Sequence, residues 1–226
     1  MRTRDVFRLE AERLSEVLGG LSEADFSRPT ACLPWSVRDL VAHVRTGAGR
    51  IVGMLAEPAP PRAEVDAATY FGPTKFAPET DAARIDSARR EGTEFTTGRE
   101  LATDLDRAWR EAYDVTARVP GERVVRTRHG DPMTVDDFLA TRVVEVGVHG
   151  LDLAAALDRE PWLTAPAARL IAGLLTAAAG TAGDGLTDEL GWDRLTLIAK
   201  ATGRWPLTGV EQRVVDRRGV RWPAFG

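Results

Sequence analysis

Apolar residues recur with a helical period along most of the chain, and each interruption of that period predicts the end of a helix. A first helix is expected over residues 2–18, where it stops at two glycines. A second is expected over residues 36–57, because Ser36 and Asp39 have the spacing of a capping box at its start. The prolines of residues 58–78 then predict a crossover of about 22 residues, long enough to run the length of a helical bundle.

Three further elements are expected in the middle of the chain. Residues 79–119 contain no proline and predict one long helix, or two helices broken near Gly92 or Gly98. Residues 124–127 predict a short strand, followed by a turn, that serves as a connector. A further helix is expected over residues 132–157, and its start repeats the capping pattern of the second helix.

The remaining residues predict a small region that follows the bundle. Residues 164–179 are typical of a fifth helix, and a glycine-rich loop separates them from a last piece that is too small for its own core. We therefore expect a mainly α protein. Residues 1–160 form a four-helix bundle with a long crossover between its second and third helices, and residues 161–226 form a small α or α/β appendage packed on it.

The helix over residues 132–157 carries an unusual stripe of charge. It is apolar on nearly all sides, which predicts burial at the centre of the bundle. Four ionisable residues interrupt this pattern at spacings of three, four and three, which places them on one face: Arg142, Glu145, His149 and Asp152. Burying four such groups is costly unless they are paired or bound to a cation.

Glu145 and His149 lie one turn apart and offer an oxygen and a nitrogen to the same point, as two ligands of one transition metal require. His43, on the helix over residues 36–57, is the natural third ligand, because antiparallel packing of the two helices brings it to the same level within about one turn. Two histidines and one carboxylate leave a fourth zinc position open, which is the catalytic pattern. The alternative is a buried salt-bridge network in which His43 is an ordinary core histidine.

Composition narrows the classes of function. The 226 residues have a formal net charge of −4 with acids and bases interspersed, so no basic stripe is expected to bind nucleic acid. No uninterrupted apolar run reaches the roughly 18 residues of a membrane span, and no membrane association is expected. The single cysteine, Cys32, excludes an internal disulfide and suits a reducing, cytoplasmic location.

Two runs of sequence carry a resemblance to a known family. Residues 35–44 (WSVRDLVAHV) and residues 142–153 (RVVEVGVHGLDL) resemble the mycothiol-dependent maleylpyruvate isomerase family, which belongs to the DinB-like superfamily. The resemblance covers about residues 5–160, with the two runs in the right order and separation. It implies a DinB-like four-helix bundle that binds a divalent metal, usually zinc, and uses the open metal position to activate a thiol.

The resemblance also implies roles for single residues. His43, Glu145 and His149 match the metal ligands of the family. Arg142 and Asp152 match positions that orient the site.

The C-terminal piece is shorter than the α/β domain of full-length family members. Residues 201–207 resemble the motif that closes that domain, and Arg204 matches its arginine needed for activity. We expect Arg204 or Arg142 to hold a substrate carboxylate in a bidentate pair. Arg142, Asp152 and Arg204 are therefore the candidate catalytic residues beside the metal ligands.

The resulting hypothesis is a zinc-dependent thiol transferase or isomerase, a monomer or a homodimer, that uses mycothiol as cosubstrate and acts on a small electrophile. Metal coordination makes the thiol a thiolate at neutral pH. One alternative is a metal-binding or ligand-binding bundle without catalysis. Another is a metal-dependent hydrolase, which ranks lower because no general base beyond the ligands is identifiable.

Three other residues have simpler interpretations. His129 lies in a turn, where solvent exposure is expected more often than a role at the mouth of the site. Cys32 is expected to be a small buried hydrophobic residue. Trp35 is expected to act as a hydrophobic staple at the start of its helix.

Overall fold

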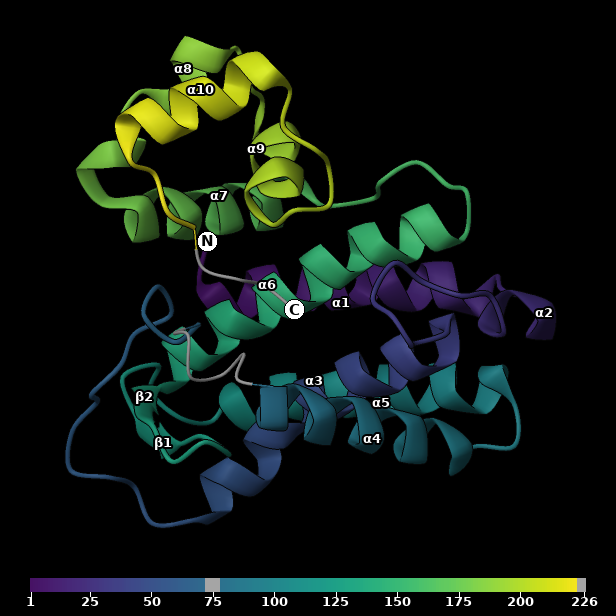
Figure 1. Ribbon diagram of the computed structural model, residues 1–226. Helices are drawn as coiled ribbons and strands as arrows, with labels where there is room; N and C mark the ends of the chain where they lie inside the picture. Colours follow the sequence, from purple (N-terminus) through teal and green to yellow (C-terminus); the bar gives the residue numbers. More distant parts are fainter. Residues whose placement is uncertain (72–77, 223–226) are drawn as a thin grey trace.

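Four helices pack into a closed bundle in the computed structural model, which describes residues 1–71 and 78–222 (Figure 1). They are α1 (Thr3–Gly19), α3 (Val37–Ala56), α5 (Gly98–Thr116) and α6 (Val135–Ala156). Helix α1 contacts α5 and α6, and α3 contacts the same two helices, so the ring of contacts closes around one hydrophobic core. Two smaller elements flank the bundle: α2 (Glu23–Phe26), and α4 (Pro78–Thr93) against α3. The expected mainly helical four-helix bundle is confirmed.

Side-chain caps explain where three bundle helices begin. Ser36 Oγ accepts a hydrogen bond from Asp39 N–H, and the Asp39 carboxylate accepts one from Ser36 N–H, which forms the expected capping box of α3. Thr97 forms an equivalent box with Glu100 at the start of α5. Thr134 caps α6. The shared start pattern predicted for α3 and α6 is thus confirmed as shared capping chemistry.

The chain forms two helices where a single long helix was one of two expectations. Helix α4 ends at Thr93 and α5 begins at Gly98. A methyl group at position 98 would lie 2.1 Å from Cδ2 of Phe26, so the Phe26 ring of α2 packs directly on this glycine. Glu23 of the same short helix accepts the Gly98 N–H at 2.9 Å. The break near Gly98 is therefore confirmed, and α2 fixes it in place.

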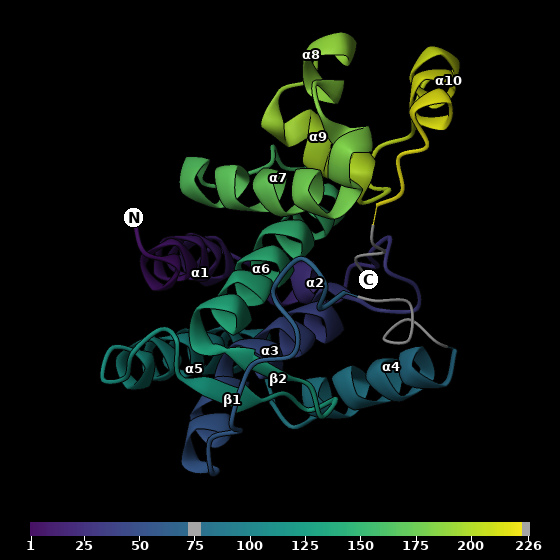
Figure 2. The same ribbon diagram turned by 90° about the vertical axis from the view of Figure 1, so that its left-hand side faces the viewer.

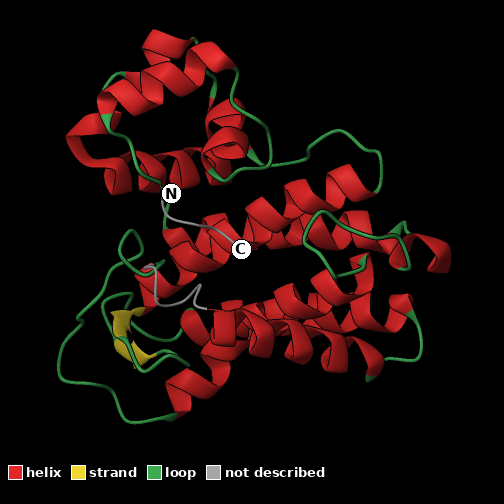
Figure 3. Ribbon diagram, viewed as in Figure 1, coloured by secondary structure: helices red, strands yellow, loops and turns green. Residues whose placement is uncertain are grey.

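A short hairpin connects α5 to α6. Strand β1 (Val124–Arg126) pairs antiparallel with β2 (Pro132–Thr134), and Figure 3 shows this ribbon in yellow beside the red helices. Pro132–Thr134 was expected to belong to the following helix, and it forms the second strand instead. Glu64 and Val65 donate backbone hydrogen bonds to the Pro132 carbonyl, so the crossover after α3 lies along the hairpin. Residues 72–77 of that crossover, Pro73 among them, lie outside the described residues.

The region after α6 consists of helices joined by loops within its described residues and lies on one side of the bundle (Figures 1 and 2). Its elements are α7 (Ala165–Ala179), the 3-10 turn η2 (Gly180–Gly183), α8 (Leu186–Leu190), α9 (Arg194–Ala201) and α10 (Gly209–Arg218). Of the two expected forms, the α appendage is the one observed. Ile171, Leu175 and Ile198 join the core of the bundle, while Trp192 and its neighbours form a second, smaller cluster.

One helical stretch in the described chain, Ala165–Gly183, is long and apolar enough to cross a membrane by length and composition alone. No stretch of that kind was expected from the sequence. The stretch includes α7, which contacts α1, α6 and α9 and buries Ile171 and Leu175. The face of α7 that carries Ile171 and Leu175 is therefore buried against other helices of the protein.

Candidate active site

The charged stripe on α6 lies in the interior, as its sequence predicts. Helix α6 is buried on nearly all sides. Arg142 is 6%, His149 5% and Asp152 3% exposed, so all three ionisable side chains are removed from bulk water. Glu145 is half-buried. Each of these groups must therefore find its partners inside the protein.

Helices α3 and α6 run in opposite directions and bring three predicted residues together. His43 faces Glu145 and His149, and four residues further along α3, Gly47 faces Arg142. Glu145 Oε2 lies 3.2 Å from His43 Nε2 and 3.6 Å from His149 Nε2. The three donor atoms all lie within 4.8 Å of one another. The expected antiparallel packing and common level are thus observed.

A glycine on α3 makes room for Arg142. A methyl group at position 47 would lie 2.7 Å from Arg142 Nη1, so the guanidinium lies directly against the α3 backbone. Arg142 Nε and Nη2 both donate to Thr141 Oγ1 at 3.2 Å. The guanidinium carbon, Cζ, lies 4.9 Å from the centre of the Phe138 ring. Nη2 is 3.7 Å from Glu145 Oε1. Arg142 therefore supplies the positive charge beside the Glu145 carboxylate.

Asp152 fixes the other side of the His149 ring. Its Oδ2 lies 3.0 Å from His149 Nδ1. Arg204 donates to both carboxylate oxygens of Asp152, from Nε at 3.0 Å and from Nη2 at 2.9 Å, and its Nη1 donates to the Thr202 carbonyl. A carboxylate that accepts from Nδ1 keeps the proton on that nitrogen and leaves Nε2 directed at Glu145. Arg204, from the loop after α9, thus supports His149 through Asp152.

The partners around each group shift its pKa. Burial alone would raise the pKa of Glu145, but Arg142 and the two histidines lower it well below its usual range. Burial lowers the pKa of His43, against the opposing effect of Glu145. Burial also opposes the charged form of Asp152. Hydrogen bonds from His149 and Arg204 outweigh burial and lower the pKa of Asp152 below its usual range. Both carboxylates are therefore ionised at neutral pH, and His43 is neutral.

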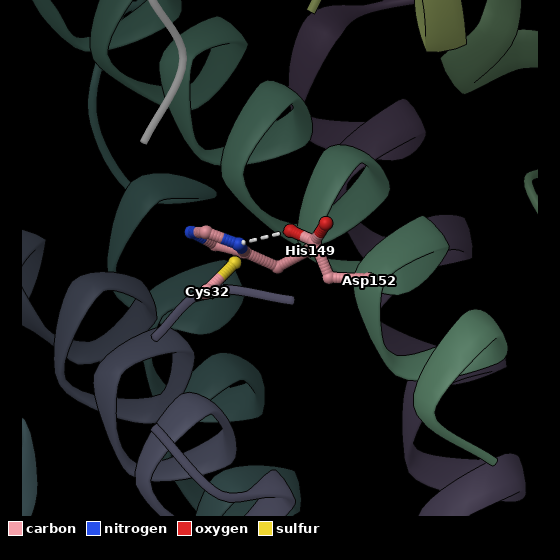
Figure 4. Close-up of side chains that lie close together, drawn as sticks. All are labelled: Cys32, His149 and Asp152. Atoms are coloured by element: carbon pink, nitrogen blue, oxygen red, sulfur yellow. Dashed lines mark hydrogen bonds and ion pairs between the residues drawn. The ribbon is translucent and has the colours of Figure 1, made fainter. Parts of the chain in front are cut away.

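Two residues with simple sequence interpretations lie beside this cluster. The Trp35 ring is 4.9 Å from the His43 ring and 6.5 Å from the His149 ring, measured between centroids, so it lies beside both histidines. Cys32 is half-buried, and its sulfur lies near His149 and Asp152 (Figure 4). Nothing in the spacing of the sequence connects Cys32 with residues more than a hundred positions away.

A pocket opens next to the three donor atoms. It encloses about 840 Å³, including space open to solvent. His43, Glu145 and His149 line it together with four arginines, namely Arg50, Arg84, Arg128 and Arg142. His129 is exposed, as expected, and also lines the pocket. Sequence reasoning missed Arg50, although its position seven residues after His43 places both on one stripe of α3.

Comparisons with known proteins identify the family and the fold. Residues 7–154 match the mycothiol maleylpyruvate isomerase N-terminal domain family. No curated protein matches the chain. Two solved structures are similar in fold: the mycothiol-dependent maleylpyruvate isomerase, at a TM-score of 0.52 and 16% identity, and a histidine-to-alanine mutant of it, at 0.54 and 17%. Each comparison covers 77% of this chain and 68% of the other.

The family match extends over more than half of the sequence and includes both runs on which the predicted resemblance depends. It spans His43 and the whole stripe from Arg142 to Asp152, whereas Arg204 lies beyond it. The chain therefore belongs to the mycothiol maleylpyruvate isomerase N-terminal domain family, a family of enzymes.

Proposed function

We propose that this protein is a metal-dependent enzyme that activates mycothiol as a thiolate for attack on a small electrophile. In a transferase the thiol sulfur stays bonded to the electrophilic carbon. In an isomerase the sulfur adds to a double bond and leaves again after rotation about the resulting single bond. The observation that carries the proposal is the convergence of His43, Glu145 and His149 on one point at the base of an open pocket.

The donor set fits zinc. Ligand atoms about 2.0–2.2 Å from a zinc ion in tetrahedral geometry lie about 3.3–3.6 Å from one another. The separations of Glu145 Oε2 from the two imidazole nitrogens, 3.2 and 3.6 Å, bracket this range closely. Two imidazoles, each of which is neutral once it binds a metal, and one carboxylate are also the ligand types of catalytic zinc sites, in which a fourth position stays open.

A second group of donors is less suited to a metal. Cys32, His149 and Asp152 also have ligand atoms within 4.8 Å of one another. Both oxygens of Asp152 are already bonded to Arg204, and Nδ1 of His149 is bonded to Asp152. We therefore assign the metal to the Nε2 side of His149.

Each remaining residue of the site has a supporting task. A bound zinc ion would supply the positive charge that keeps a thiol deprotonated at neutral pH. Asp152 and Arg204 hold the His149 ring, and Arg142 keeps Glu145 ionised. Trp35 covers one side of the histidines and excludes water there. The pocket leaves the opposite side accessible to the thiol and the electrophile.

We further propose that residues 161–226 complete this site from outside the matched domain, because Arg204 reaches Asp152 from the loop after α9. The short appendage then has a catalytic purpose, although Arg204 itself acts through Asp152 and His149. This assignment gives Arg204 a positioning task in place of the expected contact with substrate.

The proposal is tested by replacing one ligand. Zinc-loaded wild-type protein is expected to consume mycothiol in the presence of an electrophile such as dimethyl maleate, and His43→Ala is expected to reduce the rate at least about a hundredfold. Arg89→Ala, a change at an exposed position of α4 outside the pocket lining, should leave the activity unchanged. Equal rates in wild type and His43→Ala, with folding verified by circular dichroism, would refute the assignment. Zinc binding without thiol consumption would favour a non-catalytic protein.

A further inference from the structure

Few side chains in the pocket beside the three donor atoms can give a proton to a substrate. Its arginines stay protonated at neutral pH, and His43, Glu145 and His149 are the candidate metal ligands. Within the described lining this leaves Tyr70 and His129. Addition of a thiol across a double bond needs such a donor, because the carbon next to the new C–S bond gains a hydrogen.

Tyr70 is the sheltered member of this pair. Its side chain is 7% exposed, whereas His129 is exposed and its Nε2 accepts a hydrogen bond from Arg128 Nε at 3.1 Å. The Tyr70 ring packs edge-on against the Phe71 ring, with 5.2 Å between centroids, and lies 6.4 Å from the His129 ring. Water can replace an exposed donor but has little access to a side chain this buried, so Tyr70 is the stronger candidate.

Backbone contacts hold Tyr70 at the wall of the pocket. The crossover after α3 is joined to the hairpin at the Pro132 carbonyl, and Ala67 N–H then donates to Asp137 Oδ1 at 3.2 Å. Tyr70 N–H donates to the Asp66 carbonyl at 2.9 Å, which closes a turn just before the tyrosine. Because Asp137 lies in the first turn of α6, the tyrosine is fastened to the helix that carries two of the three donor atoms.

The charges that act on Tyr70 belong to the same site. Burial raises the pKa of Tyr70, Arg142 lowers it and Glu145 raises it again, so both charges lie close enough to affect the hydroxyl. The phenol therefore keeps its proton at neutral pH. A group in that state can act as an acid toward a substrate but not as a base.

We infer that Tyr70 is a catalytic residue that gives its hydroxyl proton to the substrate carbanion formed when the thiolate adds to a double bond. This inference rests on the proposed function and adds a residue to the same site. The sulfur bonds to one carbon, the π electron pair moves to the neighbouring carbon, and that carbon takes the proton from Tyr70 Oη. The proton that the next thiol loses on binding restores the phenol, so thiol and double bond become a thioether.

The carbanion has two fates, and Tyr70 controls only one of them. Protonation gives the thioether. Rotation about the single bond, followed by loss of the thiolate, gives the isomerised double bond and needs no proton. Both products come from one intermediate, so damage to thiol binding or to the metal site lowers both rates by the same factor. Loss of the proton donor lowers the thioether alone.

The test follows both products by proton NMR, as initial rates, with zinc-loaded protein, mycothiol and dimethyl maleate. Tyr70→Phe keeps the ring and removes the hydroxyl. We expect it to reduce thioether formation about a hundredfold, the low end of general-acid contributions, and to leave formation of dimethyl fumarate unchanged or increased. Tyr113→Phe is the matched control, because its hydroxyl lies 3.5 Å from Asp5, outside the pocket lining, and neither rate should change.

Binding measurements complete the test. Zinc content and the Kd of mycothiol, measured by calorimetry, should be the same in Tyr70→Phe and wild type. Equal losses of both products, no loss of either, or a loss of zinc in Tyr70→Phe would overturn the inference and leave the proposed function in place. A wild type that forms dimethyl fumarate but no thioether would also overturn it. A wild type that forms neither product would reject the proposed function, and this inference with it.

Discussion

Replacing Asp152 by asparagine removes the charge that connects the C-terminal region to the candidate metal site. Asp152 is 3% exposed, and it binds Arg204 through two hydrogen bonds of 3.0 and 2.9 Å and His149 through one of 3.0 Å. In Asp152→Asn the guanidinium of Arg204 stays largely buried without a countercharge. Breaking a buried pair in this way costs about 3–5 kcal/mol.

The same substitution is expected to loosen the His149 ring. An asparagine side chain can still accept one hydrogen bond, but without the charge that orients Nδ1–H. Loss of such an outer partner typically reduces metal affinity about 10–100-fold, which corresponds to about 1.4–2.7 kcal/mol. The pKa of Asp152 lies below its usual range, so the wild-type contribution to stability is fully present above the ordinary aspartate pKa of about 4 and is lost progressively as the pH falls below that value.

Urea denaturation and zinc competition titration measure the two effects separately. A double-mutant cycle with Arg204→Gln isolates the ion pair, with an expected coupling of about 2–3 kcal/mol, because each single change leaves the other partner buried. Arg13→Gln, an exposed residue of α1, is the control and should change stability by less than about 0.5 kcal/mol. A change below about 0.5 kcal/mol in both stability and zinc affinity of Asp152→Asn would contradict the assigned role.

Three further predictions follow from other parts of the structure. Gly47→Ala places a methyl group 2.7 Å from Arg142 Nη1, so activity should fall at least about fivefold while the melting temperature stays within a few degrees; unchanged activity would count against the close approach. Glu10, 1% exposed, has its pKa raised by burial from 4.5 to about 7, so the folded state holds a proton that the unfolded state has lost. Wild-type stability should therefore fall by up to about 3 kcal/mol from pH 4.5 to 7, a slope absent in Glu10→Gln urea titrations, and equal slopes would refute this. Zinc at about 100 times its Kd should stabilise the wild type by about 2.7 kcal/mol but not His43→Ala; scanning fluorimetry with and without a chelator tests the difference, and equal shifts would contradict the ligand assignment.

Local rules accounted for the boundaries of most helices. The capping box at Ser36 and the side-chain cap at Thr134 involve residues only three positions apart, so the sequence contains both partners of each hydrogen bond. The same local spacing placed Arg142, Glu145 and His149 on one face of a buried helix. The direction of α3 relative to α6 followed from the lengths of the connections, and this was enough to bring His43 to the correct level.

Contacts between segments far apart in the sequence could not be predicted from local residue patterns. Pro132–Thr134 continues the helical pattern of α6, but pairing with β1 stabilises it as a strand. Gly98 could be proposed as a break, whereas the ring of Phe26 that requires a glycine there comes from a segment more than seventy positions earlier. The bidentate pair of Arg204 with Asp152 likewise depends on how the appendage packs on α6.

The pocket lined by four arginines could not be predicted from the sequence for the same reason. The spacing of His43 and Arg50 places both on one stripe of α3, but a stripe does not indicate whether it faces the core, solvent or a cavity. That answer depends on the hairpin, which contributes Arg128 to the same pocket. Charge that gathers from several elements is therefore visible only in three dimensions.

Anomalous diffraction at the zinc absorption edge, from crystals of the zinc-loaded protein, tests the central claim most directly. The account predicts a single strong peak about 2.0–2.2 Å from His43 Nε2, Glu145 Oε2 and His149 Nε2, and its loss in Glu145→Ala. A peak between Cys32 and Asp152, or a fully loaded protein without a peak among the three predicted ligands, would contradict it.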